Sequence, residues 1–116
     1  MKDVAYVQKF VDVLNLLSSA ASQQISFLEK RNFPVDELAL MFDDYFAPWR
    51  HLAEGEIPAE VKAVLKELDD YLTRMSGVSS NWSYEALGSA DDWQTVRQLA
   101  RRCIKEIWRS SFAFDS

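Results

Sequence analysis

The sequence predicts an all-α fold, a compact antiparallel bundle of about four main helices. Apolar residues recur at steps of three or four along four stretches of the chain, which is the period of one helix face. No stretch shows the alternation of apolar and polar residues that is typical of a half-buried strand. The 3 glycines and 3 prolines are too few for a turn-rich all-β fold. The 116 residues suit one helical domain, residues 1–116.

The first segment predicts one long helix from about Asp3 to Lys30. A bend near Ser18 and Ser19 would fit it, because serine hydroxyls compete for backbone hydrogen bonds. Its apolar stripe is wide enough to contact two or more neighbours and consists of Val4, Val7, Val11, Leu14, Ala21, Ile25 and Leu28.

The second helix is shorter, since it begins near Pro34 and ends at Pro48. Proline is favoured in a first helical turn, and Asp36 and Glu37 suit the positive N-terminal end of a helix. Residues 49–56 are expected to form a loop or an irregular turn. The apolar stripe of this helix is Leu38, Met41, Phe42 and Tyr45.

The third helix begins at Pro58 and ends at Gly77, which are typical start and stop residues. Its buried stripe is Val61, Val64, Leu65, Leu68, Leu72 and Met75. Segment 79–88 is irregular, and its large apolar residues are expected to fold back onto the core: Trp82, Tyr84 and Leu87.

The last helix is preceded by a capping-box pattern, in which Ser89 is followed by an acid, Asp92, three positions later. The tail, residues 110–116, is expected to fray. The apolar stripe of the last helix is Trp93, Val96, Leu99, Ala100, Cys103, Ile107 and Trp108.

Composition argues against several classes of protein. A single cysteine excludes an intrachain disulfide framework and a CxxC zinc site. The formal net charge of −5 disfavours nonspecific binding to nucleic acid. The longest uncharged run, residues 13–28, contains seven Asn, Ser or Gln residues and does not suit a membrane span. We therefore expect no nucleic-acid partner, no membrane partner and a cytoplasmic location.

Residues that could support catalysis are sparse, and we expect no enzyme. The only histidine, His51, stands beside Arg50 and is typical of a surface residue. Cys103 falls on an apolar stripe, where cysteine acts as a small buried hydrophobe. The glycines form no phosphate-binding loop, and no Glu-x-x-His pair indicates a di-metal bundle. We therefore expect no catalytic, cofactor-binding or metal site, although an enzyme stays a third alternative.

Charge is distributed unevenly along the chain. Residues 36–70 contain ten acids and three bases, a net charge of −7. Residues 93–109 contain five bases and one acid, a net charge of +4. Solvated helix faces with some cross-helix pairs would explain this pattern. A docking face for a basic partner would also explain it, because opposite potentials speed encounter and fix orientation.

Aromatic residues interleaved with the acids favour the docking interpretation. Tyr45 and Trp49 follow the acid pair Asp43–Asp44. Tyr71 directly follows the acid pair Asp69–Asp70. Tight interfaces favour such anchors within polar surroundings. Trp49 is the better anchor candidate, because Tyr45 falls on the apolar stripe. The candidate partner-binding residues that this pattern indicates are Asp43, Asp44, Trp49, Asp69 and Asp70.

The middle and end of the chain resemble a group of bacterial toxin-immunity proteins, those of the colicin D immunity and contact-dependent growth inhibition type. The landmarks are Phe42 through Tyr45, then Trp49 and Arg50, then Val64 through Tyr71, and the acidic opening Asp91, Asp92 and Trp93. The resemblance covers somewhat over half of the chain. It implies a non-catalytic protein that neutralises a cognate toxin, often a nuclease, with acidic side chains placed where substrate phosphates would bind. The positions that match these acids here are Asp43, Asp44, Glu67, Asp69 and Asp70, which adds Glu67 to the candidate partner-binding residues.

The leading hypothesis is therefore a stoichiometric inhibitor of a basic toxin catalytic domain, acting through an acidic face that contains aromatic residues. The alternative is a non-catalytic interaction or regulatory helical module. In that case the wide apolar face of the first helix could continue into a homodimer interface. The sequence is compatible with a monomer or a weak homodimer.

Overall fold

A computed structural model describes residues 4–51 and 57–110 of the chain. These residues form six α-helices and two short 3-10 helices, and they contain no strand. The all-α class is confirmed, but the described residues contain more helices than the expected four. The elements are α1 (Val4–Ser18), α2 (Ala21–Arg31), α3 (Asp36–Phe46), η1 (Ala47–His51), α4 (Ala59–Met75), η2 (Ser79–Asn81), α5 (Tyr84–Ser89) and α6 (Asp91–Ser110).

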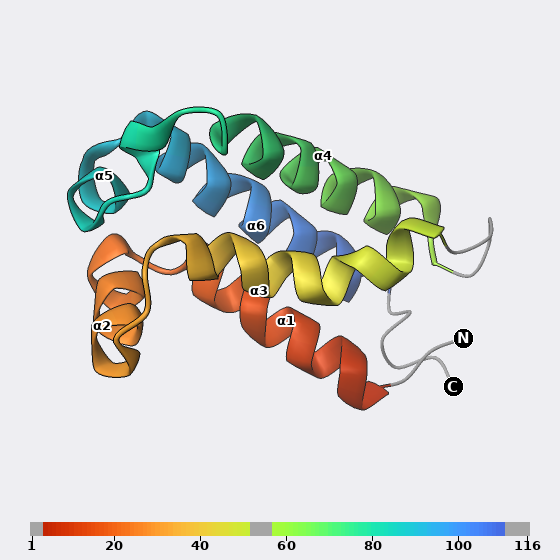
Figure 1. Cartoon of the computed structure of the whole chain (residues 1–116). Coiled ribbons are helices and arrows are strands. Elements are labelled where there is room, and N and C mark those ends of the chain that lie inside the picture. Colours follow the sequence, from red (N-terminus) through yellow and green to blue (C-terminus); the bar gives the residue numbers. More distant parts are fainter. Residues whose placement is uncertain (1–3, 52–56, 111–116) are drawn as a thin grey trace.

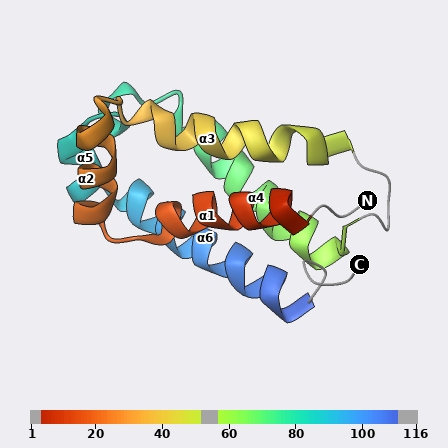
Figure 2. The ribbon, with the colours of Figure 1, turned by 90° about the horizontal axis from the view of Figure 1, so that it is seen from below.

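The helices α1, α3, α4 and α6 enclose the core. Helix α6 packs against α1 and α4, and α3 packs against the same two helices (Figure 1). The view in Figure 2 places α3 and α6 on opposite sides of the molecule. The short helices α2 and α5 contact each other and cover one end (Figure 1). Helices α1 and α4 run toward this end, whereas α3 and α6 run away from it.

Most residues of the predicted apolar stripes form the core, but Val4, at the start of α1, is 48% exposed and lies outside it. Burying one large apolar side chain contributes about 1.5–3 kcal/mol, so this interior is the main source of stability. Trp49 and Val35 join the core although neither was on a predicted stripe. The residues that are at most 1% exposed include Phe10, Leu14, Leu38, Phe42, Leu65, Leu68, Trp93, Val96 and Ile107.

The expected single helix from Asp3 to Lys30 is wrong, because the chain breaks between α1 and α2. Ala20 is extended, with φ −60° and ψ 151°. The hydroxyls of Ser18 and Ser19 donate to the carbonyl of Asn15, at 2.9 and 2.7 Å, so serine does compete with the helix here. The break lets α2 turn across the end of the molecule (Figure 1).

The start of the last helix also differs from expectation. Ser89 does not cap α6, because it is the last residue of α5 and its hydroxyl donates to the Glu85 carbonyl at 2.9 Å. Segment 79–88 contains the short helix η2 and most of α5, joined by a bend at Trp82 and Ser83, so it is only partly irregular. Ser83 caps α5 by accepting from the Ala86 N–H at 3.0 Å. Trp108 is 42% exposed and does not pack in the core as expected. Except for Ser110, the tail expected to fray lies outside the described residues.

Candidate protein-binding face

The structure divides the predicted acidic residues between two surfaces. Asp43 and Asp69 line a groove between α3 and α4. Glu67 and Asp70 line a different hollow, between α4 and α6. Asp44 is exposed on α3. The expected single acidic patch is therefore wrong, because residues of α4 only one or two positions apart point to different neighbouring helices.

Trp49 is not an exposed anchor, contrary to expectation. It is 6% exposed, and its ring centroid lies 5.0 Å from that of Phe10 and 6.0 Å from that of Tyr6. The 3-10 turn η1 follows α3 directly and places the indole against α1. The aromatic ring therefore stabilises the α1–α3 contact and is unavailable to a partner.

Arg50 holds two of the predicted acids. Its Nη2 lies 2.7 Å from Asp69 Oδ1, its Nε lies 3.2 Å from Asp69 Oδ2, and Nη2 also binds Asp43 Oδ1. Hydrogen bonds to Asp69 and then to Asp43 raise the pKa of Arg50 above its ordinary value. The guanidinium also lies 5.2 Å from the centroid of the Phe46 ring. This network joins η1 to α3 and α4, and one positive charge serves two carboxylates.

The acids on the other side of α4 are paired as well. Glu67 Oε2 lies 3.2 Å from Arg102 Nη1, and Asp70 Oδ2 lies 3.0 Å from Lys66 Nζ. These pairs are exposed, so each contributes only about 0–1 kcal/mol. Four of the five predicted acids thus have a basic partner, and Asp44 has none among the described residues. Arg50 and Lys66 are already counted in the net charge of −7 for residues 36–70, so Arg102 is the partner that lowers this charge further.

Negative charge without an ionic partner among the described residues lies on the outer side of α3. This helix carries four acids and no base, and three of its acids form no ion pair with any residue that the structure describes. At 100° per residue, its acids and Leu40 fall within an arc of about 120°, with Leu40 at the centre. Leu40 is 54% exposed. We name this surface the α3 acidic face, and it consists of Asp36, Glu37, Leu40, Asp43 and Asp44.

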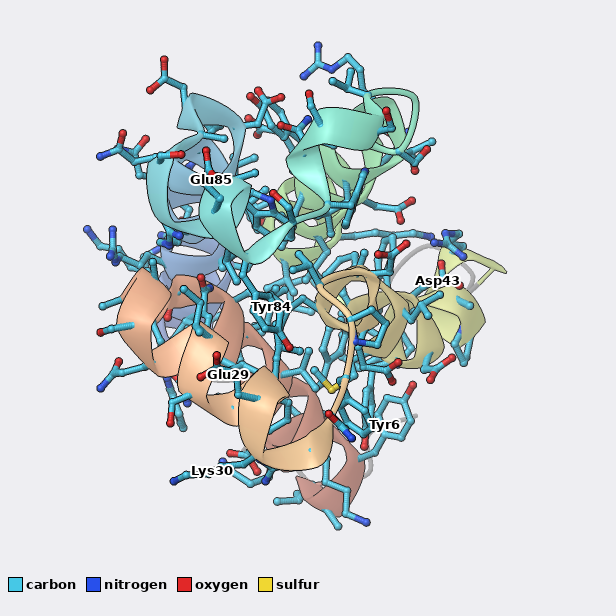
Figure 3. All side chains as sticks on the ribbon, turned by 60° about the vertical axis from the view of Figure 1, so that its left-hand side comes forward. Tyr6, Glu29, Lys30, Asp43, Tyr84 and Glu85 are labelled. Carbon is cyan, nitrogen blue, oxygen red and sulfur yellow. The ribbon has the colours of Figure 1, made fainter. Side chains whose placement is uncertain are left out.

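A groove of about 200 Å³ adjoins the α3 acidic face. At one end, the Trp82 indole N–H donates to the Met75 carbonyl at 3.1 Å, and the ring meets Trp93 edge to face at 5.5 Å. Figure 3 shows Asp43 at the outer edge of α3, away from Tyr84 in the middle of the molecule. The groove is lined by Ala39, Leu40, Phe42, Asp43, Asp69, Leu72, Thr73, Ser76 and Trp82.

Cys103, one of the two candidate catalytic side chains, is not an activated nucleophile. Cys103 is fully buried with Sγ 3.4 Å from the Val64 carbonyl oxygen, and burial raises the pKa of its thiol to about 12. The thiol is therefore protonated at neutral pH and unsuited to nucleophilic attack. The side chain of His51 lies outside the described residues. No three His, Cys, Asp or Glu residues of the described part could together hold a metal ion.

Sequence reasoning missed the centre of the face, Leu40. The predicted stripe of α3 runs through Leu38 and Phe42, so Leu40 falls on the opposite side of the helix. One signal in the sequence could have identified Leu40: it is a large apolar residue that is flanked by acids and lies off the buried stripe. Trp82 could not be placed in a groove from sequence, because its position depends on the turn after α4.

Comparison of the chain with protein-family models, curated proteins and solved structures found no match. No helix of the described ranges has both the length and the apolar composition needed to cross a membrane.

Proposed function

We propose that this chain is an immunity-type inhibitor that binds a basic toxin catalytic domain and performs no chemistry. The observation that supports this function best is the α3 acidic face, with four acids, no base and an exposed leucine at its centre. The resemblance in sequence supports a toxin as the partner, and among toxins it favours a nuclease. The inhibitor would act in the cytoplasm, with its helices as an antiparallel scaffold built on four main helices.

The physical basis is charge complementarity around an apolar contact. Nuclease sites bind phosphates with basic side chains, so an acidic face attracts such a site and competes with its substrate. Leu40 supplies apolar area that loses water on binding, while the acids form a polar rim. Of the acids predicted from the sequence, Glu67 and Asp70 are assigned no direct role in binding. They lie beside α6 and form ion pairs with Arg102 and Lys66.

The test uses the toxin domain encoded by the neighbouring reading frame and a triple charge reversal, Asp36→Lys, Glu37→Lys and Asp44→Lys. These acids have no ionic partner among the described residues, so their replacement leaves the Arg50 network intact. We expect the association rate to fall by about tenfold or more at low salt. The effect should shrink at high salt, because ions screen exposed charges. Stopped-flow binding at several salt concentrations measures both.

The matched control reverses three acids at the end covered by α2 and α5, with Glu29→Lys, Glu85→Lys and Asp91→Lys. Figure 3 shows Glu29 and Glu85 apart from Asp43 on α3. Both triple variants change the net charge equally, and both alter acids in first helical turns. Equal slowing by the two variants, or no slowing by the first, would contradict docking through α3. A neighbouring frame whose product does not bind the chain would remove the toxin hypothesis.

The homodimer alternative has less support. The wide apolar face that suggested it is buried inside the chain, since Val7, Phe10, Val11, Leu14 and Leu17 are all at most 3% exposed. Only Val4 remains as a large exposed apolar residue among the described residues of α1.

A further inference from the structure

We propose that the groove between α3 and α4 receives a single arginine side chain, presented by an apolar segment of the partner. This inference rests on the proposed function and names the contact at its centre. An arginine has an aliphatic stem that packs on apolar walls and a charged head that stays at the rim. The groove has both parts, because Leu40, Leu72 and Trp82 supply apolar walls and Asp43 lies at its edge.

The polar side chains that the structure describes in the groove offer acceptors and no free donor. The Thr73 hydroxyl donates its hydrogen to the Asp69 carbonyl at 2.9 Å, and the Ser76 hydroxyl donates to the Thr73 carbonyl at 2.5 Å. The Trp82 N–H is used by the Met75 carbonyl. Both hydroxyl oxygens therefore keep only lone pairs for a ligand. A guanidinium is the matching group, because it has five donors and no acceptor.

Charge also favours a cation at this position. Asp69 uses both carboxylate oxygens on Arg50, whereas Asp43 uses only Oδ1 in the contacts of the described residues. Oδ2 of Asp43 can therefore accept from a second guanidinium, and the Asp43 side chain is 54% exposed. One guanidinium serving two carboxylates leaves a net charge of −1 at the groove edge, before Asp44 is counted.

The size of the groove selects a side chain over a small molecule. Its volume of about 200 Å³ is below the range of about 300–1,000 Å³ typical of small-molecule sites. A groove of this size on a helical surface suits one long residue of a partner protein.

A peptide titration tests the groove without the toxin domain. The probe is an acetylated and amidated Leu-Arg-Leu tripeptide, added to the ¹⁵N-labelled full chain and followed by NMR. We expect weak, saturable shifts confined to the amides of Leu40, Thr73 and Ser76 and to the Trp82 indole. The control peptide has citrulline in place of arginine, which keeps the shape and removes the charge. It should bind about tenfold more weakly or worse, and equal binding would overturn the inference.

A variant of the chain gives a second test. Thr73→Arg places an arginine four residues after Asp69 on α4, so that the chain fills its own groove. We expect the peptide shifts to disappear. The matched control, Ser22→Arg, adds the same charge at an exposed hydroxyl position on α2 and should leave the titration unchanged. Unchanged shifts in Thr73→Arg, or shifts spread over the whole surface of the unmodified chain, would overturn the inference.

The two proposals fail separately. If the chain binds the toxin domain through α3 but does not bind the peptide, the inhibitor function is supported and the arginine site in the groove is contradicted. If the chain binds the peptide at Leu40 and Thr73 but does not bind the toxin domain, the arginine site is supported and the toxin partner is contradicted.

Discussion

Gln24 shows how one buried polar residue fixes the break between α1 and α2. It is fully buried, and its Nε2 donates to the carbonyls of Leu16 and Leu17 at 3.1 and 3.0 Å. Its Oε1 accepts from Arg97 Nε at 3.2 Å, and Arg97 also donates to the Leu87 carbonyl. Burial lowers the pKa of the Arg97 guanidinium. These bonds satisfy carbonyls that the end of α1 leaves open and join α2 to α6.

Replacing Gln24 by leucine should therefore destabilise the fold strongly. The variant has an apolar side chain of similar size but leaves the Leu17 carbonyl and one guanidinium N–H without partners, whereas the Leu16 carbonyl still accepts from the Ser19 N–H. Each unsatisfied buried group costs about 1–3 kcal/mol, so two such groups predict a loss of about 2–6 kcal/mol in the free energy of unfolding. Urea denaturation measures this loss. The exposed neighbour provides the control, and a Gln23→Leu change as costly as Gln24→Leu would show that the buried bonds contribute nothing.

Residue-scale partners explain why the candidate site was only partly predictable from sequence. Asp43 and Asp44 were expected on the surface of a helix, and they lie there. Their surroundings depend on residues far along the chain, since Arg50 meets Asp69 and Arg102 meets Glu67 across different helices. Helical periodicity assigns a side chain to a face, but it does not say which neighbour covers that face.

At the scale of the elements, Asp92 ties three segments together. Its Oδ1 accepts from the Tyr71 hydroxyl of α4 at 2.7 Å, and its Oδ2 accepts from Asn81 Nδ2 of η2 at 2.9 Å. The bond from Tyr71 and then that from Asn81 lower the pKa of the Asp92 carboxyl below its ordinary value of 3.8. The ionised carboxylate therefore holds the start of α6 against α4 and the turn that follows it.

The hydrogen bonds that Asp92 accepts from Tyr71 and Asn81 predict a specific pH dependence of the free energy of unfolding. Because the pKa of Asp92 is lower in the folded chain than in the unfolded one, its stabilisation is present above pH 3.8. It is lost as the pH falls through the lowered value. We expect the free energy of unfolding of Asp92→Asn to fall less steeply in acid than that of the unmodified chain. Urea midpoints from neutral to strongly acidic pH measure the difference.

Asp91 is the matched control for this pH dependence, since it is exposed, lies in the same first turn and has no hydrogen-bond partner among the described residues. Asp91→Asn should keep the acid dependence of the unmodified chain. Identical acid dependence in the Asp92→Asn variant would contradict the tie.

The apolar stripes of the longer helices were predictable, because core packing requires that these positions be buried. The stripes of α3, α4 and α6 lie in the core largely as expected. The connections were not predictable in the same way. Ser89 matches a capping box in sequence, but Ser83 caps α5 and the next helix begins at Asp91. Short helices such as α5 have too few residues for periodicity to show, and tertiary contacts decide their ends.

At the scale of the whole molecule, the fold separates charge. Helix α3 carries four acids without a base, and α6 lies on the opposite side with five bases and three acids, two of them in its first turn (Figure 2). Ion pairs of Arg102 with Glu67 and of Arg109 with Glu106 neutralise part of the positive charge of α6. The negative charge of α3 is therefore the better defined of the two. Such a separation would orient the chain as it approaches a basic protein.

Mapping the interface with the proposed toxin partner tests docking through α3 most directly. NMR cross-saturation from an unlabelled toxin domain to the ¹⁵N-labelled chain reports which amides lie at the contact. We predict attenuation along α3, residues 36–46, and at residues 73–76 of α4, with the strongest effect at Leu40. Attenuation centred on α1 and α6, or on the end formed by α2 and α5, would contradict a docking site on the α3 acidic face.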